Sequence, residues 1–261
     1  MSAAPPPVIE VRDVTTRFGA NLVHDHVSLR VEPREVFGIA GGSGSGKTVL
    51  LREILMLQRP TSGSVWLLGE DVTHIEEAAG RALRSRCGVL FQQGALFSGL
   101  SVAENVAVPL REHTRMQRAF AREVAALKIA LVGLPPEAAA KRPDELSGGM
   151  RKRAALARAI VLDPEILFLD EPSAGLDPVS AAGIDELIVR LRRLLGLTIV
   201  MVTHDLDSLW RVTDRVAVLG AGRIRGIGRM DELAGAADPL IREYFSGPRG
   251  RAARGRSWNR E

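Results

Sequence analysis

Hydrophobic and polar positions alternate near the N-terminus as they do in strands with one exposed face. The alternation covers residues 8–14 and 29–31, and a period of two places every second side chain on the same face. Residues 36–40 instead form a continuous apolar run that ends in glycines, which is typical of a buried strand. We therefore expect antiparallel strands, then a buried strand, and then a helix over residues 48–57.

The middle of the chain, about residues 92–143, has a helical rather than a stranded pattern. In it Phe120, Val124, Leu127 and Leu131 recur at steps of four, three and four, which places them on one helix face. Such a stripe predicts core packing more often than a binding surface, although both interpretations fit the pattern.

Helices and strands alternate again after residue 143. The pattern predicts helices over residues 151–162 and 181–195 and strands over 166–169 and 198–202. Buried strands joined by helices indicate a parallel sheet. We expect an α/β fold with a mainly parallel core sheet, an N-terminal antiparallel β subdomain and an inserted α-helical subdomain at about residues 92–143, all within one domain of residues 1–247.

Composition supports a globular protein. Of the 261 residues, 46% are hydrophobic and 25% are charged, well away from the disordered class. The single cysteine, Cys87, excludes an internal disulfide and fits a reducing compartment. The first residues lack the pattern of a signal peptide, and no apolar run approaches the ~18 to 20 residues that cross a bilayer. We expect a cytoplasmic protein.

The net charge of +4 comes from the C-terminal end. Residues 248–261 hold five arginines and one acid, so the preceding 247 residues are neutral overall. This distribution argues against a nucleic-acid-binding protein. We expect a basic, disordered tail, which either contacts an anionic lipid, RNA or subunit surface or has no specific role.

The segment that follows the predicted buried strand contains four glycines, then Lys47 and Thr48. Residues 41–48 read Gly-Gly-Ser-Gly-Ser-Gly-Lys-Thr and match G-x-x-x-x-G-K-[ST]. Backbone N–H groups of such a loop wrap a triphosphate while the next helix points its positive end at it. Lys47 would bind the β- and γ-phosphates, and Thr48 would ligate Mg²⁺. A flexible linker is the alternative, but a linker does not usually join a buried strand to a helix.

A second predicted strand, residues 166–171, is apolar and ends in Asp170 and Glu171. Burying two carboxylates is costly without a cation, so a metal is the natural compensation. We expect Asp170 to hold Mg²⁺ and Glu171 to accept a proton from the attacking water.

Residues 146–150, Leu-Ser-Gly-Gly-Met, precede a predicted helix. Ser147, Gly148 and Gly149 would open that helix with free donors and form a second anion site. An ordinary N-capped helix is the alternative for this segment taken alone. In a head-to-tail homodimer each copy of the segment would complete the nucleotide site of the other chain.

Two further polar residues complete the predicted site. Gln92 would orient water and ligate Mg²⁺. His204 follows the strand of residues 198–202 and lies where ligands of parallel sheets bind. The other histidines, His24, His26, His74 and His113, have no such context and receive no assignment.

In this order the motifs resemble those of the nucleotide-binding subunits of ABC transporters, over nearly the whole chain. The resemblance implies a P-loop NTPase fold of the ABC ATPase type that binds ATP and Mg²⁺. Phe18 matches the aromatic residue that stacks on adenine, and residues 173–177 match the D-loop at the dimer interface. The implied nucleotide-binding residues are Phe18, Gly41, Gly42, Ser43, Gly44, Ser45, Gly46, Lys47, Thr48, Ser147, Gly148 and Gly149. The implied catalytic residues are Glu171, His204 and Gln92, and the implied metal ligands are Thr48, Gln92 and Asp170.

Departures from the usual ABC motifs point to one subfamily of these ATPases. Most relatives have Gln where this chain has Met150. Together with residues 88–97 and 105–113, this segment looks like the ATPase of Mla or MCE-type lipid transport systems. The resemblance implies a homodimer at the cytoplasmic face of the inner membrane, an integral permease and an MCE-type lipid-binding partner. Another transporter subfamily, a soluble non-transport ABC ATPase and a purely regulatory nucleotide binder are the alternatives.

Such a permease would place a cytoplasmic helix in an apolar groove near residues 92–97. Ala95, Leu96 and Phe97 are the candidates for its lining. Ordinary core packing within the helical subdomain is an equally good interpretation of these three residues.

Overall fold

The computed structural model describes residues 5–246. Within these residues the chain forms two compact units, one of residues 5–83 and 198–246 and the other of residues 84–197. We call them the phosphate-loop unit and the helical unit. The predicted basic tail, residues 248–261, lies outside the described residues.

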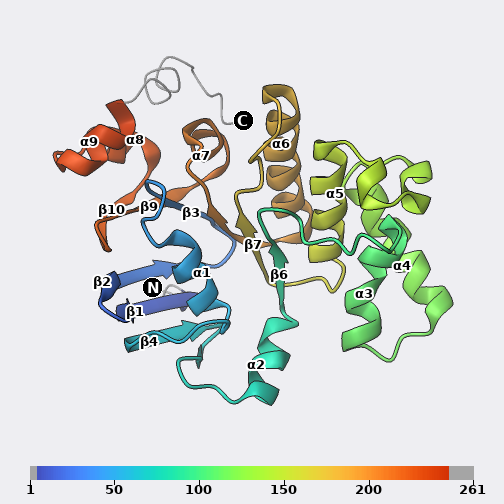
Figure 1. Cartoon of the computed structure of the whole chain (residues 1–261), viewed down its shortest axis with the longest axis horizontal. Coiled ribbons are helices and arrows are strands. Elements are labelled where there is room, and N and C mark those ends of the chain that lie inside the picture. The colour runs from blue at the N-terminus through green and yellow to red at the C-terminus, as the bar shows by residue number, and fades with distance from the viewer. Residues whose placement is uncertain (1–4, 247–261) are drawn as a thin grey trace. The chain divides into compact units, whose positions relative to one another are not determined.

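An antiparallel sheet forms the N-terminal part of the phosphate-loop unit (Figure 1). The strands lie in the order β2-β1-β4-β5, with neighbours antiparallel. Ile9, Val11 and Val14 are buried, and Arg12 and Asp13 are exposed, but Glu10 is buried as well. The predicted alternation is therefore confirmed only in part. Its strands are β1 (Ile9–Phe18), β2 (Asn21–Val31), β4 (Ser62–Leu67) and β5 (Glu70–Asp71).

The second sheet of this unit is mainly parallel. Strand β3 (Val36–Ala40) pairs in parallel with β8 (Thr198–Val202) and with β9 (Arg215–Gly220). All five residues of β3 and of β8 are buried, as a continuous apolar run predicts. Strand β10 (Arg223–Gly228) pairs antiparallel with β9.

Five helices belong to or border the phosphate-loop unit. Helix α1 ends three residues before the predicted end at residue 57, because Met56 adopts a left-handed φ of 59° that an α-helix does not contain. The helices are α1 (Lys47–Ile54), α2 (Glu77–Arg84), α7 (Leu206–Val212), α8 (Met230–Ala234) and α9 (Pro239–Ser246).

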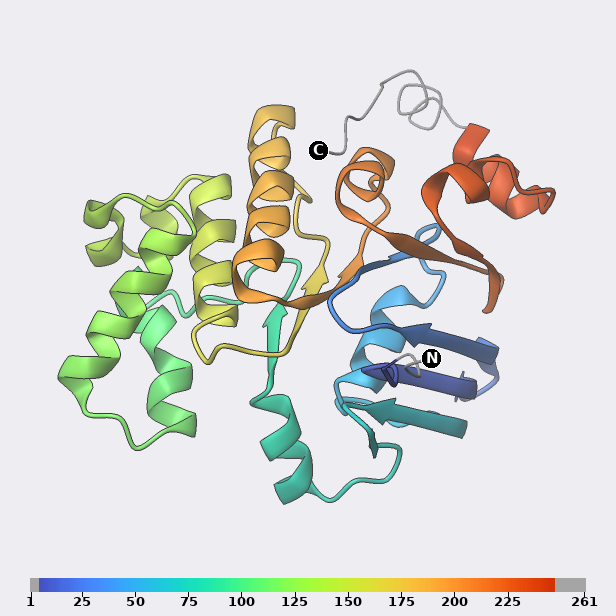
Figure 2. The ribbon, with the colours of Figure 1, turned by 180° about the vertical axis from the view of Figure 1, so that it is seen from behind.

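The helical unit combines one parallel strand pair with packed helices (Figure 2). Its strands are β6 (Cys87–Leu90) and β7 (Ile166–Asp170). Short 3₁₀ turns cover Pro136–Ala140 and Pro143–Glu145. The helices are α3 (Val102–His113), α4 (Arg118–Leu131), α5 (Gly148–Ala159) and α6 (Pro178–Leu195).

Helix α4 packs with a different face from the predicted one. Phe120 is 56% exposed and Leu127 is 69% exposed, whereas Ala121, Ala125 and Ile129 are buried. Small side chains let helices approach closely, so the alanine face packs and the larger side chains remain outside. The expectation of a core stripe is therefore wrong for Phe120 and Leu127 in the single chain.

None of the helices within residues 5–246 is both long and apolar enough to cross a membrane.

Candidate functional site

The phosphate loop joins the buried strand β3 to helix α1, in the order that the sequence predicts. Gly41 has a φ of 154°, and a Cβ there would lie 2.2 Å from the backbone oxygen of Leu219. Gly46 has a φ of 98° and is the N-cap residue of α1. Among the described residues, no side chain caps this helix start. The loop therefore needs glycine at both ends, and its helix presents backbone donors rather than a side-chain cap.

Lys47 turns back onto its own loop. Its side chain is buried, and Nζ lies 2.9 Å from the carbonyl oxygen of Gly41 and 2.8 Å from that of Gly42. Ser45 Oγ lies 3.5 Å from the same nitrogen. The ammonium group is therefore held against the backbone of the loop by charge-assisted hydrogen bonds.

A cavity of about 440 Å³ adjoins the phosphate loop. It is lined by the consecutive loop residues Gly42 to Ser45, by the start of β2 and by the turn between β9 and β10. Phe18, predicted to stack on adenine, is 45% exposed at the end of β1. It does not line this cavity. The loop residues thus come together, while the predicted role of Phe18 stays a prediction.

His204 follows strand β8 at the same edge of the sheet at which the phosphate loop follows strand β3. In the parallel pair of β3 and β8, Ile39 lies opposite Val202, so both strands end at one edge. The Thr203 backbone N–H donates to the Ile39 carbonyl at 3.3 Å. His204 follows directly and is exposed.

In the helical unit, the predicted site residues lie at the ends of a second pair of parallel strands, β6 and β7. In β6 and β7, Leu90 lies opposite Leu169, so Gln92 and Glu171 both follow the carboxyl ends of neighbouring strands. Asp170 is only 5% exposed, while Glu171 is half-buried with a left-handed φ of 50°. A non-glycine residue in this conformation costs about 1–3 kcal/mol and persists only where its surroundings hold it.

Lys152 on helix α5 holds the loop that carries Gln92 and the loop that carries Glu171. Its buried side chain donates from Nζ to the carbonyl oxygen of Gln92 at 2.5 Å and to that of Glu171 at 3.0 Å. Burial lowers the pKa of Lys152, and the charges of Asp170 and Glu171 oppose that shift. The sequence analysis assigns no role to Lys152, so it misses the bridge between the two loops.

Two arginines of α5 also donate hydrogen bonds to backbone carbonyls, as Lys152 does. Arg158 binds the carbonyls of Gly94 at 2.8 Å and Ala95 at 2.7 Å, and burial lowers its pKa. Arg153 binds those of Val132 at 2.7 Å and Gly183 at 3.3 Å. The signal in the sequence is a cluster of positive charges, residues 151–153, at the start of a predicted helix.

The segment of residues 146–150 forms the predicted helix start. Ser147 is the N-cap of α5, and its Oγ accepts from the Met150 N–H at 3.2 Å. Gly148 and Gly149 approach the neighbouring segment closely, since a Cβ on Gly148 would lie 3.1 Å from Leu176. Asp177 caps α6, and hydrogen bonds from Ser180 hold its pKa below the usual range.

The backbone of residues 94–97 is held by hydrogen bonds from Asn105 and Arg158, and two of its apolar side chains are exposed. Phe97 is 54% exposed, Ala95 is exposed, and Leu96 is half-buried. The buried Asn105 accepts from the Phe97 N–H at 2.8 Å and donates to its carbonyl at 3.0 Å. Of the two interpretations left open by the sequence, a contact surface fits these exposures better than core packing.

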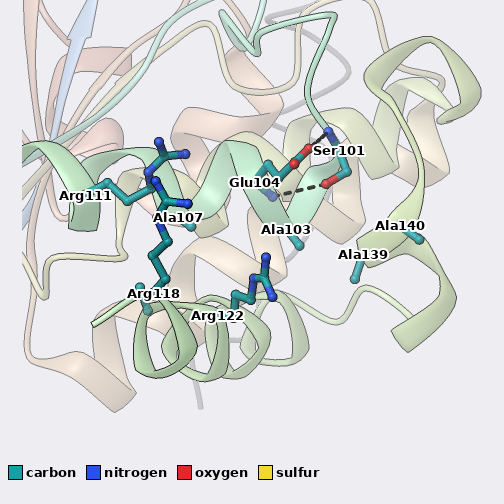
Figure 3. A pocket seen from close by; sticks show the side chains of 10 residues that line it. Ser101, Ala103, Glu104, Ala107, Arg111, Arg118, Arg122, Ala139 and Ala140 are labelled. Carbon is teal, nitrogen blue, oxygen red and sulfur yellow. Dashed lines mark hydrogen bonds between the residues drawn. The ribbon is translucent and has the colours of Figure 1, made fainter. Parts of the chain in front are cut away.

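Another cavity, of about 690 Å³, lies between α3, α4 and the turn after α4 (Figure 3). Arg111, Arg118 and Arg122 line it, together with alanines of both helices and of the turn. At its edge, hydrogen bonds from Ser101 hold the pKa of Glu104 below the usual range. None of the predicted site residues lines it, so cavity size alone does not locate the chemistry of this chain.

The predicted metal ligands remain a prediction. Within residues 5–246, no three His, Cys, Asp or Glu side chains are gathered as a metal site. Thr48, Gln92 and Asp170 each carry a side-chain oxygen, the kind of ligand that Mg²⁺ prefers. In nucleotide sites Mg²⁺ takes its remaining ligands from phosphates and water.

Comparison with known proteins defines the class. Residues 24–174 match the family described as ABC transporter. The Mycobacterium tuberculosis protein named probable ribonucleotide transport ATP-binding protein mkl is 39% identical over 92% of this chain and 67% of its own length. The Escherichia coli intermembrane phospholipid transport system ATP-binding protein MlaF is 38% identical over 92% of this chain and 89% of its own.

Solved structures agree with this result. A dimeric ATP-binding cassette bound to ADP and phosphate superposes with a TM-score of 0.78 at 29% identity, covering 85% of this chain and 98% of that one. CbiO1 from Clostridium perfringens, part of the ABC transporter complex CbiONQ, gives 0.81 at 26% identity and covers 96% and 98%. The chain belongs to the ABC transporter family. It is an ATP-binding, ATP-hydrolysing subunit with the α/β fold of the P-loop NTPases.

Proposed function

We propose that this chain powers a membrane transporter of phospholipid or a related lipid, as an Mla- or MCE-type ATPase. The observation that carries the proposal is its 38% identity to the Haemophilus influenzae protein named as the ATP-binding protein MlaF of an intermembrane phospholipid transport system. That similarity extends over 92% of this chain and 90% of the relative. The Met150 segment of the signature supports the same subfamily.

Nucleotide binding falls to the loop of residues 41–48. Lys47 supplies charge to the β- and γ-phosphates, and the backbone donors at the start of α1 supply hydrogen bonds. Phe18 stacks on the adenine. Thr48, Gln92 and Asp170 would hold Mg²⁺, which would supply positive charge to neutralise the phosphates.

The residues that carry out hydrolysis follow the carboxyl ends of two pairs of parallel strands, β3 with β8 and β6 with β7. Glu171 accepts a proton from the attacking water, Gln92 orients that water, and His204 donates to the phosphate. Lys152 is a positioning residue, because it holds the backbones of both Gln92 and Glu171. The strained φ of Glu171 is thereby maintained.

Two copies of the chain act together. Ser147, Gly148 and Gly149 of each copy complete the nucleotide site of the other. The dimeric cassette bound to ADP and phosphate supports this arrangement by its similarity. The exposed surface of Ala95, Leu96 and Phe97 receives a cytoplasmic helix of an integral permease, which holds the chain at the cytoplasmic face of the membrane. An MCE-type protein carries the lipid.

A ribonucleotide is the second candidate cargo, because the mycobacterial relatives carry that name at 39% identity. The test is purification of the tagged chain with its partners from detergent-solubilised membranes, followed by reconstitution into liposomes. The proposal predicts a copurifying permease, bound phospholipid and Mg²⁺-dependent ATPase activity. Ribonucleotide transport without lipid movement would favour the second cargo. A chain that purifies without any membrane protein would contradict both and favour a soluble ATPase.

A further inference from the structure

A buried histidine touches the phosphate loop from the antiparallel sheet. His24 lies on β2, is 0% exposed, and its Nε2 lies 3.1 Å from the carbonyl oxygen of Gly46. Gly46 is the last loop residue before Lys47. Because a carbonyl oxygen only accepts hydrogen bonds, Nε2 must carry a proton here. His24 thus donates to the backbone of the loop directly before Lys47.

The other ring nitrogen fixes this arrangement. His24 Nδ1 lies 3.1 Å from Glu53 Oε2, with both side chains fully buried. Glu53 Oε1 in turn accepts from Thr16 Oγ1 at 2.5 Å. The imidazole of His24 and the carboxyl group of Glu53 are therefore in direct contact inside the protein.

This chain of contacts joins three elements around one backbone atom. Thr16 lies on β1, His24 on β2, and Glu53 on the helix α1 that the loop opens. The Gly46 carbonyl also accepts the first helical hydrogen bond, from Leu50 N–H at 2.9 Å. A Cβ on Gly46 would lie 2.7 Å from His24 Nε2, so the histidine fits against this glycine closely.

From these contacts we infer that His24 is a positioning residue for nucleotide binding. It acts through Gly46: by fixing the Gly46 carbonyl it fixes the left-handed turn that precedes Lys47. The inference rests on the proposed role of residues 41–48 as the ATP site. Glu53 and Thr16 keep the imidazole in the orientation that this contact requires.

The test measures affinity and stability separately on the full chain. Titration with Mg·ATPγS gives the Kd, and thermal unfolding gives the Tm. His24→Leu should raise the Kd about tenfold, as expected for the loss of one hydrogen bond to the Gly46 carbonyl. His24→Gln keeps an amide donor and should restore most of the affinity. Val27→Ala, a buried change on the same strand, should lower the Tm and leave the Kd unchanged.

The outcomes separate this inference from the proposed function. A His24→Leu chain with a lowered Tm and the parental Kd would show a purely structural role and overturn the inference. If that variant fails to fold, Glu53→Gln decides: it should raise the Kd about threefold, and an unchanged Kd would overturn the inference. If Lys47→Ala also binds ATPγS like the parent, the proposed nucleotide site itself fails.

Discussion

In both units of this chain the predicted site residues follow the ends of paired parallel strands, but different interactions hold the loops in place. In each unit a pair of parallel strands ends at one edge, β3 with β8 in one and β6 with β7 in the other. The phosphate loop is held by close glycine packing and a buried histidine–glutamate pair. The loops of the helical unit are held by cations of α5 that donate to backbone carbonyls.

The difference matches the role proposed for each set of residues. The start of α1 has no side-chain cap among the described residues, so its backbone donors are open to the phosphates in the proposed nucleotide site. Helix α5 uses its side chains to hold the loops that carry Gln92 and Glu171. We therefore expect substitutions in the loop of residues 41–48 to change mainly affinity, and substitutions at Glu171 and Lys152 to change mainly turnover.

The largest predicted effect tests the helical unit. Glu171→Gln removes the proton acceptor for water while keeping the size of the side chain. Turnover should fall by roughly 10² to 10⁴ with nucleotide binding retained, as measured by phosphate release from the reconstituted complex and by ATP titration. Hydrolysis at the parental rate would remove Glu171 from the role of base.

The next effect tests the phosphate-loop unit. Lys47→Ala removes charge-assisted hydrogen bonds of about 1.5–3 kcal/mol, so Mg·ATP should bind at least about tenfold more weakly. Arg52→Ala, on the exposed side of the same helix, is the matched control and should leave the Kd unchanged. Equal losses in both variants would point to helix stability instead of phosphate contact.

Lys152→Met breaks the bridge between the loops of Gln92 and Glu171. Turnover should fall about tenfold while the Kd for Mg·ATP stays close to that of the parent, since two buried carbonyls lose their donor. Arg153→Met on the same helix removes contacts to Val132 and Gly183 and should lower only the Tm. A Kd that rises with unchanged turnover would reverse the division of labour between the units.

The smallest effect concerns Phe18. Phe18→Ala should weaken ATP binding about fivefold through lost base stacking, and Phe18→Tyr should retain it. Equilibrium titration with ATP and with inorganic triphosphate separates the base from the phosphates. If triphosphate binding weakens as much as ATP binding does, Phe18 supports the fold rather than the adenine.

The features that the sequence predicts well are those set by short segments. The bounds of β3 are those predicted from an apolar run that ends in glycines, and Ser147 caps a helix as its residue type indicates. These depend on local backbone preferences. The stripe on α4 was predicted wrongly because periodicity identifies a face but does not reveal that the alanine face packs more closely.

The missed contacts join residues that are far apart in the sequence. His24 meets Gly46 across 22 residues, and Lys152 meets Gln92 across 60. A histidine on a strand and a lysine on a helix both look like ordinary surface residues in the sequence. Only the fold shows that they are buried, and burial forces each polar group to find a partner.

The central claim is that two copies of this chain close on two nucleotides, each lending its Ser147 segment to the other. Native mass spectrometry of the Glu171→Gln variant, purified with its membrane partner and saturated with Mg·ATP, tests it directly. We predict two copies of the chain and two bound nucleotides in each complex. A complex that holds a single copy under these conditions would contradict the account.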